Sequence, residues 1–160
     1  MRTITVPDAN VRSPAYFVAR TSTECPYCGS PTRLLALALP QEHETLDVES
    51  QVWQRANANA FLFHVEQLSD GAMDRIRELS EHFRPAHSTD TESLYWANHC
   101  EHCNRLLEDH ELHCEPDGAF LPSSEAAASE VQLLLIREPF EAAAAGMTLE
   151  PEFFGFMRKS

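Results

Sequence analysis

The sequence has few basic residues. Its 160 residues include 12 Lys and Arg against 25 Asp and Glu, which gives a formal net charge of −13. Nucleic-acid binding draws most of its affinity from Lys and Arg that neutralise phosphates, and acidic membranes repel a chain of this charge. We therefore expect neither nucleic acid nor membrane as a partner, which leaves proteins, basic peptides and small molecules.

Long hydrophobic runs are also missing. No apolar stretch approaches the roughly 20 residues that cross a bilayer, and the runs at residues 34–39 and 133–136 have the length of strands. The first eight residues lack the apolar core of an export signal. We expect a cytoplasmic protein. Its five cysteines would be reduced in that compartment, so a disulfide framework is not expected.

The length of the chain suits one domain with its own core and is short for two. We predict a single domain over residues 1–160. Residues 1–14 contain Pro7, Asn10 and Pro14, which indicates an irregular N-terminal lead-in.

Four of the five cysteines form two Cys-x-x-Cys pairs. They are Cys25, Cys28, Cys100 and Cys103. Each such turn directs two thiolates at one metal ion, and two turns complete a tetrahedral zinc site if the fold brings them together. Gly29 and Asn104, which follow the pairs, tolerate the positive φ that such turns often need. We predict one structural Zn²⁺ per chain, held by all four cysteines, with no open position for a substrate.

The segments around the pairs predict the fold. Strand-like residues lead into both turns at 16–20 and 93–97, and residues 33–39 are apolar on both faces, as in a central strand. Between the pairs, residues 41–59 are polar and indicate a loop, residues 60–68 favour a strand, and a helix follows from Asp70 until Pro85 ends it. We predict an α+β fold: a split four-cysteine zinc ribbon with an inserted strand-helix segment and a small, mostly antiparallel sheet.

The C-terminal part gives weaker signals. Residues 131–136 favour a strand, residues 140–145 fit a helix or a strand, and Gly146 should interrupt them. The apolar end at residues 153–157 is expected to dock on the domain or on a second copy of the chain, so a homo-oligomer through this end is one expectation.

Two other chemistries are considered for the cysteine pairs. Cys25-Pro26-Tyr27-Cys28 resembles the glutaredoxin active site, but the Gly-Ser-Pro that follows should prevent the helix that activates its first cysteine. His64 and Glu66, placed ahead of the second pair, resemble the His-x-Glu and Cys-x-x-Cys of zinc-dependent deaminases, in which the Glu moves protons. That pattern has a proline where His99 stands, and it leaves the first pair without a role.

Histidines crowd around the second pair, with the fifth cysteine close behind. The group consists of His99, His102, His110, His113 and Cys114. One histidine could replace a cysteine as a ligand, or the group could hold a second metal. The ordinary alternative is that they are surface or supporting side chains.

The run Tyr95-Trp96-Ala97-Asn98-His99 directly before the second pair, with the later residues 115–120 and the first pair, resembles uncharacterised bacterial zinc-ribbon-like proteins. The resemblance implies a metal site and implies no activity. We therefore expect a non-catalytic, zinc-stabilised protein-interaction or regulatory module in the bacterial cytoplasm, with a protein as its partner. The alternatives are a zinc-dependent hydrolase or deaminase-like enzyme and, less favoured by the charge, a nucleic-acid-binding zinc ribbon.

Overall fold

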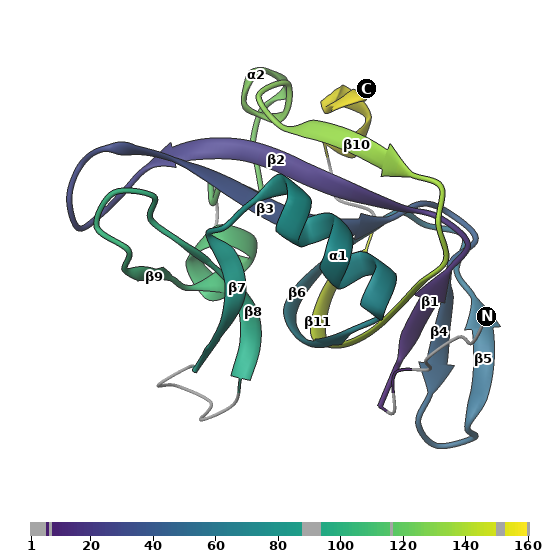
Figure 1. Cartoon of the computed structure of the whole chain (residues 1–160). Coiled ribbons are helices and arrows are strands. Elements are labelled where there is room, and N and C mark those ends of the chain that lie inside the picture. The colour runs from purple at the N-terminus through teal and green to yellow at the C-terminus, as the bar shows by residue number, and fades with distance from the viewer. Residues whose placement is uncertain (1–5, 7, 88–93, 116, 150–152, 160) are drawn as a thin grey trace.

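The computed structural model describes residues 6, 8–87, 94–115, 117–149 and 153–159. The described residues are mostly β, with 48% strand and 16% helix. Twelve strands form one sheet in which nine follow the order β12-β10-β2-β3-β6-β11-β1-β4-β5, and β7, β8 and β9 join it through β6 (Figure 1). The strands are β1 (Val11–Ser13), β2 (Tyr16–Glu24), β3 (Pro31–Leu39), β4 (Glu44–Asp47), β5 (Val52–Arg55), β6 (Ala60–Leu68), β7 (Phe83–His87), β8 (Leu94–His99), β9 (Leu106–Leu107), β10 (Gln132–Ile136), β11 (Phe140–Leu149) and β12 (Arg158–Lys159). The helices are α1 (Asp70–Leu79), a π-helix (His110–Cys114), α2 (Glu125–Ala128) and a 3₁₀ turn (Phe154–Phe156).

The predicted fold class, a small α+β zinc ribbon, is wrong. The first cysteine pair does sit between two strands, but β2 and β3 are nine residues long and continue into a twelve-stranded mixed sheet, in which β10 and β12 pair in parallel. The physical reason is that β3 is apolar on both faces and needs cover on both sides, as well as strand partners on both edges. It pairs with β2 on one edge and with β6 on the other.

The sheet buries a hydrophobic cluster on each face. Tyr16 and Val18 of β2 belong to one cluster, together with Ile76 of α1. The alternate residues Phe17 and Ala19 belong to the other, which the C-terminal end covers. This period-two division follows from the pleat of the strand. The cysteines Cys25 and Cys100 lie in the second cluster, on the face away from α1.

Helix α1 is shorter than the sequence predicts. It ends at Leu79, and Ser80 takes an extended conformation. The Ser80 hydroxyl oxygen accepts hydrogen bonds from the backbone N–H groups of His82 and Phe83, at 3.0 and 3.2 Å, and so begins a new strand. Pro85, expected to end the helix, instead lies within β7 opposite Trp96.

Three other segments differ from the sequence prediction. Residues 41–59, expected as a loop, contain the hairpin of β4 and β5. Strand β11 runs through Gly146, where the Phe63 ring of β6 occupies the space that a side chain would take. Within the expected irregular lead-in, Val11–Ser13 forms β1, and residues 1–5 and 7 lie outside the described residues.

The apolar C-terminal end docks on the sheet, which is one of the two outcomes that the sequence predicts. Phe154 is 7% exposed, and its ring lies 6.0 Å from the rings of Phe17 and Phe61. Met157 is 4% exposed in the same cluster, whereas Phe156 stays 50% exposed. The predicted strand at residues 131–136 is confirmed as β10.

Candidate metal centre

The first cysteine turn connects β2 to β3. Within it, the N–H of Cys25 donates to the carbonyl oxygen of Ser30 at 2.9 Å, and the N–H of Gly29 donates to that of Cys25 at 2.9 Å. These bonds close the turn tightly enough that Gly29 has a φ of 75°. Glycine adopts this left-handed conformation without strain, which explains its position.

The second cysteine turn connects β8 to β9 and repeats the same bonds. The N–H of Cys100 donates to the carbonyl of Arg105, and the N–H of Asn104 donates to that of Cys100, both at 3.0 Å. Asn104 has a φ of 64°. The predicted positive φ after both pairs is therefore confirmed, and the two turns present their thiols in the same local geometry.

The fold brings the two turns together, at the left of Figure 1. The Sγ atoms of Cys25 and Cys103 are 3.7 Å apart, and those of Cys28 and Cys100 are 3.6 Å apart. All four Sγ atoms lie within 4.8 Å of one another. A zinc ion with four sulfurs at about 2.3 Å separates neighbouring sulfurs by about 3.8 Å, so this donor set fits a tetrahedral metal ion. The four cysteines are positioned to bind one metal ion.

Backbone N–H groups point at the sulfurs of Cys25 and Cys100. The N–H groups of His102 and Cys103 point at the Cys100 sulfur at 3.3 and 3.5 Å, and the N–H of Tyr27 points at the Cys25 sulfur at 3.4 Å. The bond from Cys103, followed by that from His102, lowers the pKa of the Cys100 thiol to about 6. Thiolates are the species that bind metal, so the two amides at Cys100 favour the metal-binding form of this cysteine.

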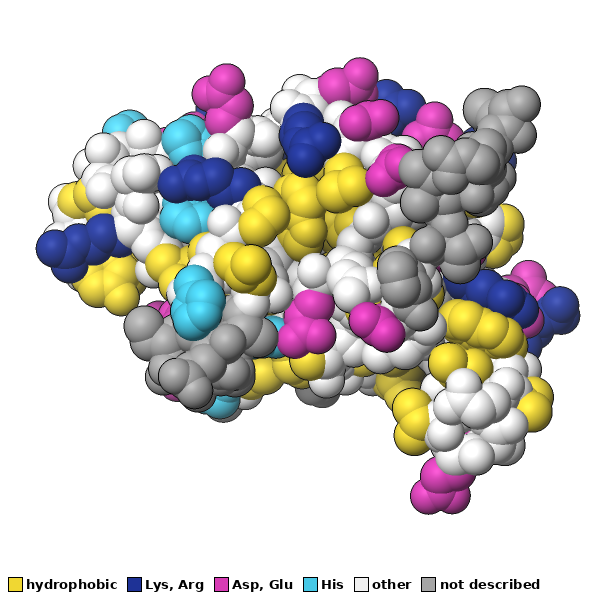
Figure 2. Space-filling model, turned by 60° about the horizontal axis from the view of Figure 1, so that its bottom comes forward, with side chains coloured by type: hydrophobic (Ala, Val, Ile, Leu, Met, Phe, Trp, Pro, Cys, Tyr) yellow, Lys and Arg dark blue, Asp and Glu magenta, His cyan; other side chains and the backbone are white. Residues whose placement is uncertain are grey.

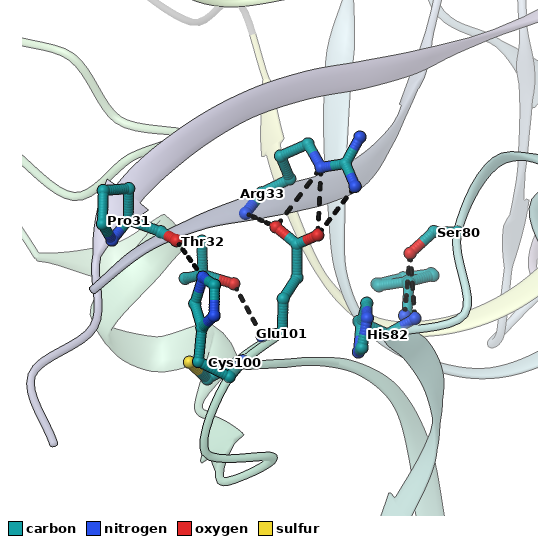
Figure 3. A network of polar contacts seen from close by, with 9 residues as sticks. Pro31, Thr32, Arg33, Ser80, His82, Cys100 and Glu101 are labelled. Carbon is teal, nitrogen blue, oxygen red and sulfur yellow. Dashed lines mark hydrogen bonds and ion pairs between the residues drawn. The ribbon is translucent and has the colours of Figure 1, made fainter. Parts of the chain in front are cut away.

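Polar contacts tie the second turn to the start of β3 (Figure 3). The Arg33 guanidinium donates to both Glu101 carboxylate oxygens, with the shortest contact at 2.7 Å, and its backbone N–H donates to Oε1 at 2.7 Å. The hydrogen bond from Arg33 lowers the pKa of Glu101 to about 2. The Glu101 N–H donates to Thr32 Oγ1 at 2.9 Å, and His102 Nε2 lies 2.9 Å from the Pro31 carbonyl oxygen. The two turns are thus held together by their neighbours as well as by their sulfurs.

A buried asparagine adds a further link between β8 and β3. The Asn98 amide accepts from the N–H of Leu35 at 2.8 Å and donates to the carbonyl oxygen of Leu35 at 2.9 Å. One side chain therefore satisfies both backbone groups of a residue in the neighbouring strand. Sequence reasoning missed this role, as it missed those of Thr32, Arg33 and Glu101. Its only signal for Asn98 was membership of the aromatic-Ala-Asn-His run.

The histidines near the second turn do not form a second metal cluster. Among the described residues, the four cysteines are the only group of three or more His, Cys, Asp and Glu side chains with ligand atoms close enough to share an ion. His99 is buried, and its Nδ1 lies 3.1 Å from the Ala97 carbonyl oxygen. His113 is 3% exposed and stacks between Phe63 and Phe120, and burial lowers its pKa to about 3. Neither histidine belongs to the four-cysteine group.

His64 and Glu66 also lie outside the four-cysteine group. His64 belongs to β6 and has a φ of 52°. Its N–H donates to Asp109 Oδ2 at 2.7 Å, and its ring stacks on Tyr95 with centroids 4.1 Å apart. The described residues therefore do not form the arrangement that the deaminase hypothesis requires.

Comparisons with protein-family models, with curated proteins and with solved structures found no match to this chain. In the part of the chain that the structure describes, no helix has the length and apolar character to span a membrane.

Proposed function

We propose that Cys25, Cys28, Cys100 and Cys103 hold one structural zinc ion, and that the protein is a non-catalytic, zinc-stabilised interaction or regulatory module of the cytoplasm. The observation that carries the proposal is the convergence of four Sγ atoms within 4.8 Å. An all-cysteine set of this size is typical of structural zinc, because thiolates favour zinc and four of them leave no open position. The cytoplasm suits the site because it keeps thiols reduced.

The ion would fasten two hairpins that the chain makes far apart. One is formed by β2 and β3, and the other by β8 and β9. When bound, zinc supplies four metal-sulfur bonds that the unfolded chain lacks, so its binding free energy becomes folding free energy. A closed site favours this structural role over the hydrolase alternative, which needs a position for water or substrate.

The interaction role is supported by side chains at the tips of the turns. Tyr27 lies between Cys25 and Cys28 in the first turn and is 54% exposed. The Arg105 guanidinium lies 5.0 Å from the centre of the Tyr27 ring. Tyrosine and arginine are enriched among the residues that dominate protein interfaces. Figure 2 shows acidic side chains scattered over one face of the molecule. A partner that binds this face would meet separate acidic residues rather than a single acidic patch.

The metal content of the wild-type chain tests the proposal. Native mass spectrometry is expected to find one zinc ion per chain. Cys25→Ser and Cys100→Ser should each lose the ion and unfold, since each removes a buried ligand. Cys114→Ser is the matched control, because Cys114 lies outside the cluster, and it should keep both zinc and fold. A wild-type protein that folds without metal would overturn the structural-zinc proposal.

The partner is tested separately. Tyr27→Ala should keep the zinc ion and reduce recovery of a protein partner in a pull-down from the native cell. Leu94→Ala, a change at a similarly exposed apolar residue outside the turns, should not. Equal recovery with the wild type and Tyr27→Ala would remove the turn tips as the interaction surface while leaving the zinc proposal intact.

A further inference from the structure

A groove of about 640 Å³ lies beside α1, on the face of the sheet that the helix only partly covers. Strands β2, β3, β10 and β12 form one wall, and residues 77–82 at the end of α1 form the other. Glu101 of the second cysteine turn also lines it. Figure 3 shows Arg33 and Glu101 on one side and Ser80 and His82 on the other. Its volume lies within the range of small-molecule sites.

The groove begins where the sheet face changes from apolar to polar. One cross-strand row belongs to the cluster under α1 and is apolar. It consists of Leu134, Val18 and Leu37. The next row lies one pleat further along the same face and carries two arginines. It consists of Arg158, Gln132, Arg20 and Leu35. Directly paired residues share a face, so the arginine side chains lie on either side of Gln132.

Basic and acidic side chains line the groove in equal number, the acids being Glu78, Glu81, Glu101 and Glu130. Four of the 12 Lys and Arg line it: Arg20, Arg33, Arg77 and Arg158. Glu101 neutralises Arg33, and Arg77 lies 3.9 Å from Asp74. Among the described residues, neither Arg20 nor Arg158 has an ion-pair partner. Arg20 Nη2 donates to Gln132 Oε1 at 3.0 Å, while the buried Nε has no hydrogen-bond partner there.

Apolar side chains lie next to these charges. Leu35 continues the arginine row and is buried, and Leu79 at the end of α1 is half-buried on the opposite wall. A ligand held by the arginines could therefore place a hydrocarbon chain between the two leucines. Such a combination of an apolar surface with a few charged groups is typical of binding sites for small organic molecules.

We propose that this groove binds a carboxylate with an apolar chain, its carboxylate between Arg20 and Arg158 and its chain between Leu35 and Leu79. This ligand site goes beyond the proposed structural role of the metal centre. The opposite wall argues for a single negative charge, since it carries Glu78, Glu81 and the carboxyl end of α1, which is the negative end of the helix dipole. A dianion such as phosphate would meet repulsion there.

Titration of the zinc-loaded, full-length chain with hexanoate tests the proposal. Amide resonances of β2, β10 and residues 77–82 should shift and saturate, with a dissociation constant of about 1 mM, as expected for a ligand of this size. Hexylamine, with the same chain and opposite charge, should produce no saturable shift. Inorganic phosphate should bind at least about tenfold more weakly than hexanoate. Absence of saturation by hexanoate, or equal binding of phosphate, would overturn the proposal.

Variants locate the site. Arg158→Gln should weaken hexanoate binding at least about tenfold, because a charge-assisted hydrogen bond is lost. Arg158 is exposed, so the fold should not depend on it, and Arg20→Gln should act in the same direction. Arg55→Gln makes the same charge change on the exposed strand β5 and should bind as the wild type does. If Arg158→Gln and Arg55→Gln bind hexanoate equally, the arginine row is not the site.

Discussion

The Sγ atoms of Cys28 and Cys100 lie 3.6 Å apart although 72 positions separate the two residues in the chain. Each belongs to a turn whose geometry is local, but their distance is set by the whole sheet. Strand β3 begins just after the first turn, and β8 ends just before the second. Contacts of Thr32, Leu35 and Asn98 hold these strand ends together. The four-cysteine cluster therefore depends on strand packing as much as on cysteine spacing.

Gly29 should resist replacement by residues with a side chain. Its φ is 75°, and a Cβ would contact nothing within 4 Å. The change Gly29→Ala therefore measures the conformational cost of the positive φ without any added steric contact. A left-handed conformation costs an L-residue about 1–2 kcal/mol, and we expect a loss of unfolding free energy of this size. Urea unfolding of the zinc-loaded protein measures it. Gly155→Ala, which also meets no neighbour and has no positive φ, should leave stability near that of the wild type.

Thr32→Val should weaken the attachment of the second turn. Thr32 is 1% exposed, and its hydroxyl accepts the Glu101 N–H, whereas valine keeps the shape and removes the acceptor. An N–H left without a partner costs about 1–3 kcal/mol, and the Glu101 amide should exchange its hydrogen faster. Thr23→Val is the matched control, because Thr23 lies directly opposite on β2 and no hydrogen bond of its hydroxyl is found among the described residues. Similar exchange in both variants would contradict the prediction.

Asp109 should make the fold less stable as pH rises from about 4 to 7. The carboxyl is 5% exposed, and burial raises its pKa to about 7, against about 3.9 in the unfolded chain. The folded state therefore binds more protons in this window, and the free energy of unfolding falls by up to about 1.4 kcal/mol per pH unit. Asp109→Asn keeps an oxygen for the His64 N–H and removes the titration. The variant should be more stable than the wild type at pH 8, with little difference at pH 4.

The difference between variant and wild type is the quantity to measure. Burial lowers the pKa of His113 to about 3. The stability that neutral His113 contributes to the fold is therefore fully present above pH 6.5 and is lost as pH falls. The stability linked to Asp109 is instead lost as pH rises. Metal binding by thiolates also weakens in acid. Both effects are shared by wild type and variant and cancel in the difference. Asp74→Asn, which removes a carboxylate from the exposed face of α1, is the control for the loss of a negative charge. A flat difference for Asp109→Asn would refute the prediction.

Gly146→Ala should destabilise the pairing of β6 with β11. A Cβ at Gly146 would lie 2.0 Å from the ring of its cross-strand partner Phe63, so the ring must move away from its stack on His113. Overpacking of this kind costs about 1–3 kcal/mol. Thermal unfolding of the zinc-loaded protein measures the loss. Gly71→Ala, in α1 and free of close neighbours, should instead stabilise the fold by up to about 1 kcal/mol, and equal shifts in both variants would show that Phe63 is not displaced.

Gly146 and the alanines before it also show why part of the sheet could not be predicted. Residues 142–145 are all alanine, which has low strand propensity, and glycine normally weakens a strand. They form β11 because β6 and β1 pair with its two edges and bury it. The partner β6 lies more than seventy residues earlier in the chain, and β1 lies earlier still. Pairing between segments this far apart leaves no pattern within β11 from which the strand could be predicted.

The sequence by itself determined which cysteines form the cluster and the local shape of the two turns that carry them. Cysteine spacing sets which thiols a turn presents, and the sterics of Gly29 and Asn104 permit its positive φ, so both properties are intrinsic to a few neighbouring residues. The tertiary structure decided that the cluster belongs to a twelve-stranded sheet, that Asn98 and Thr32 brace it, and that Arg20 and Arg158 share a groove. These relationships arise because the sheet buries both of its faces at once. The free energy of that burial comes from contacts between segments that are distant in sequence, so no single segment determines it.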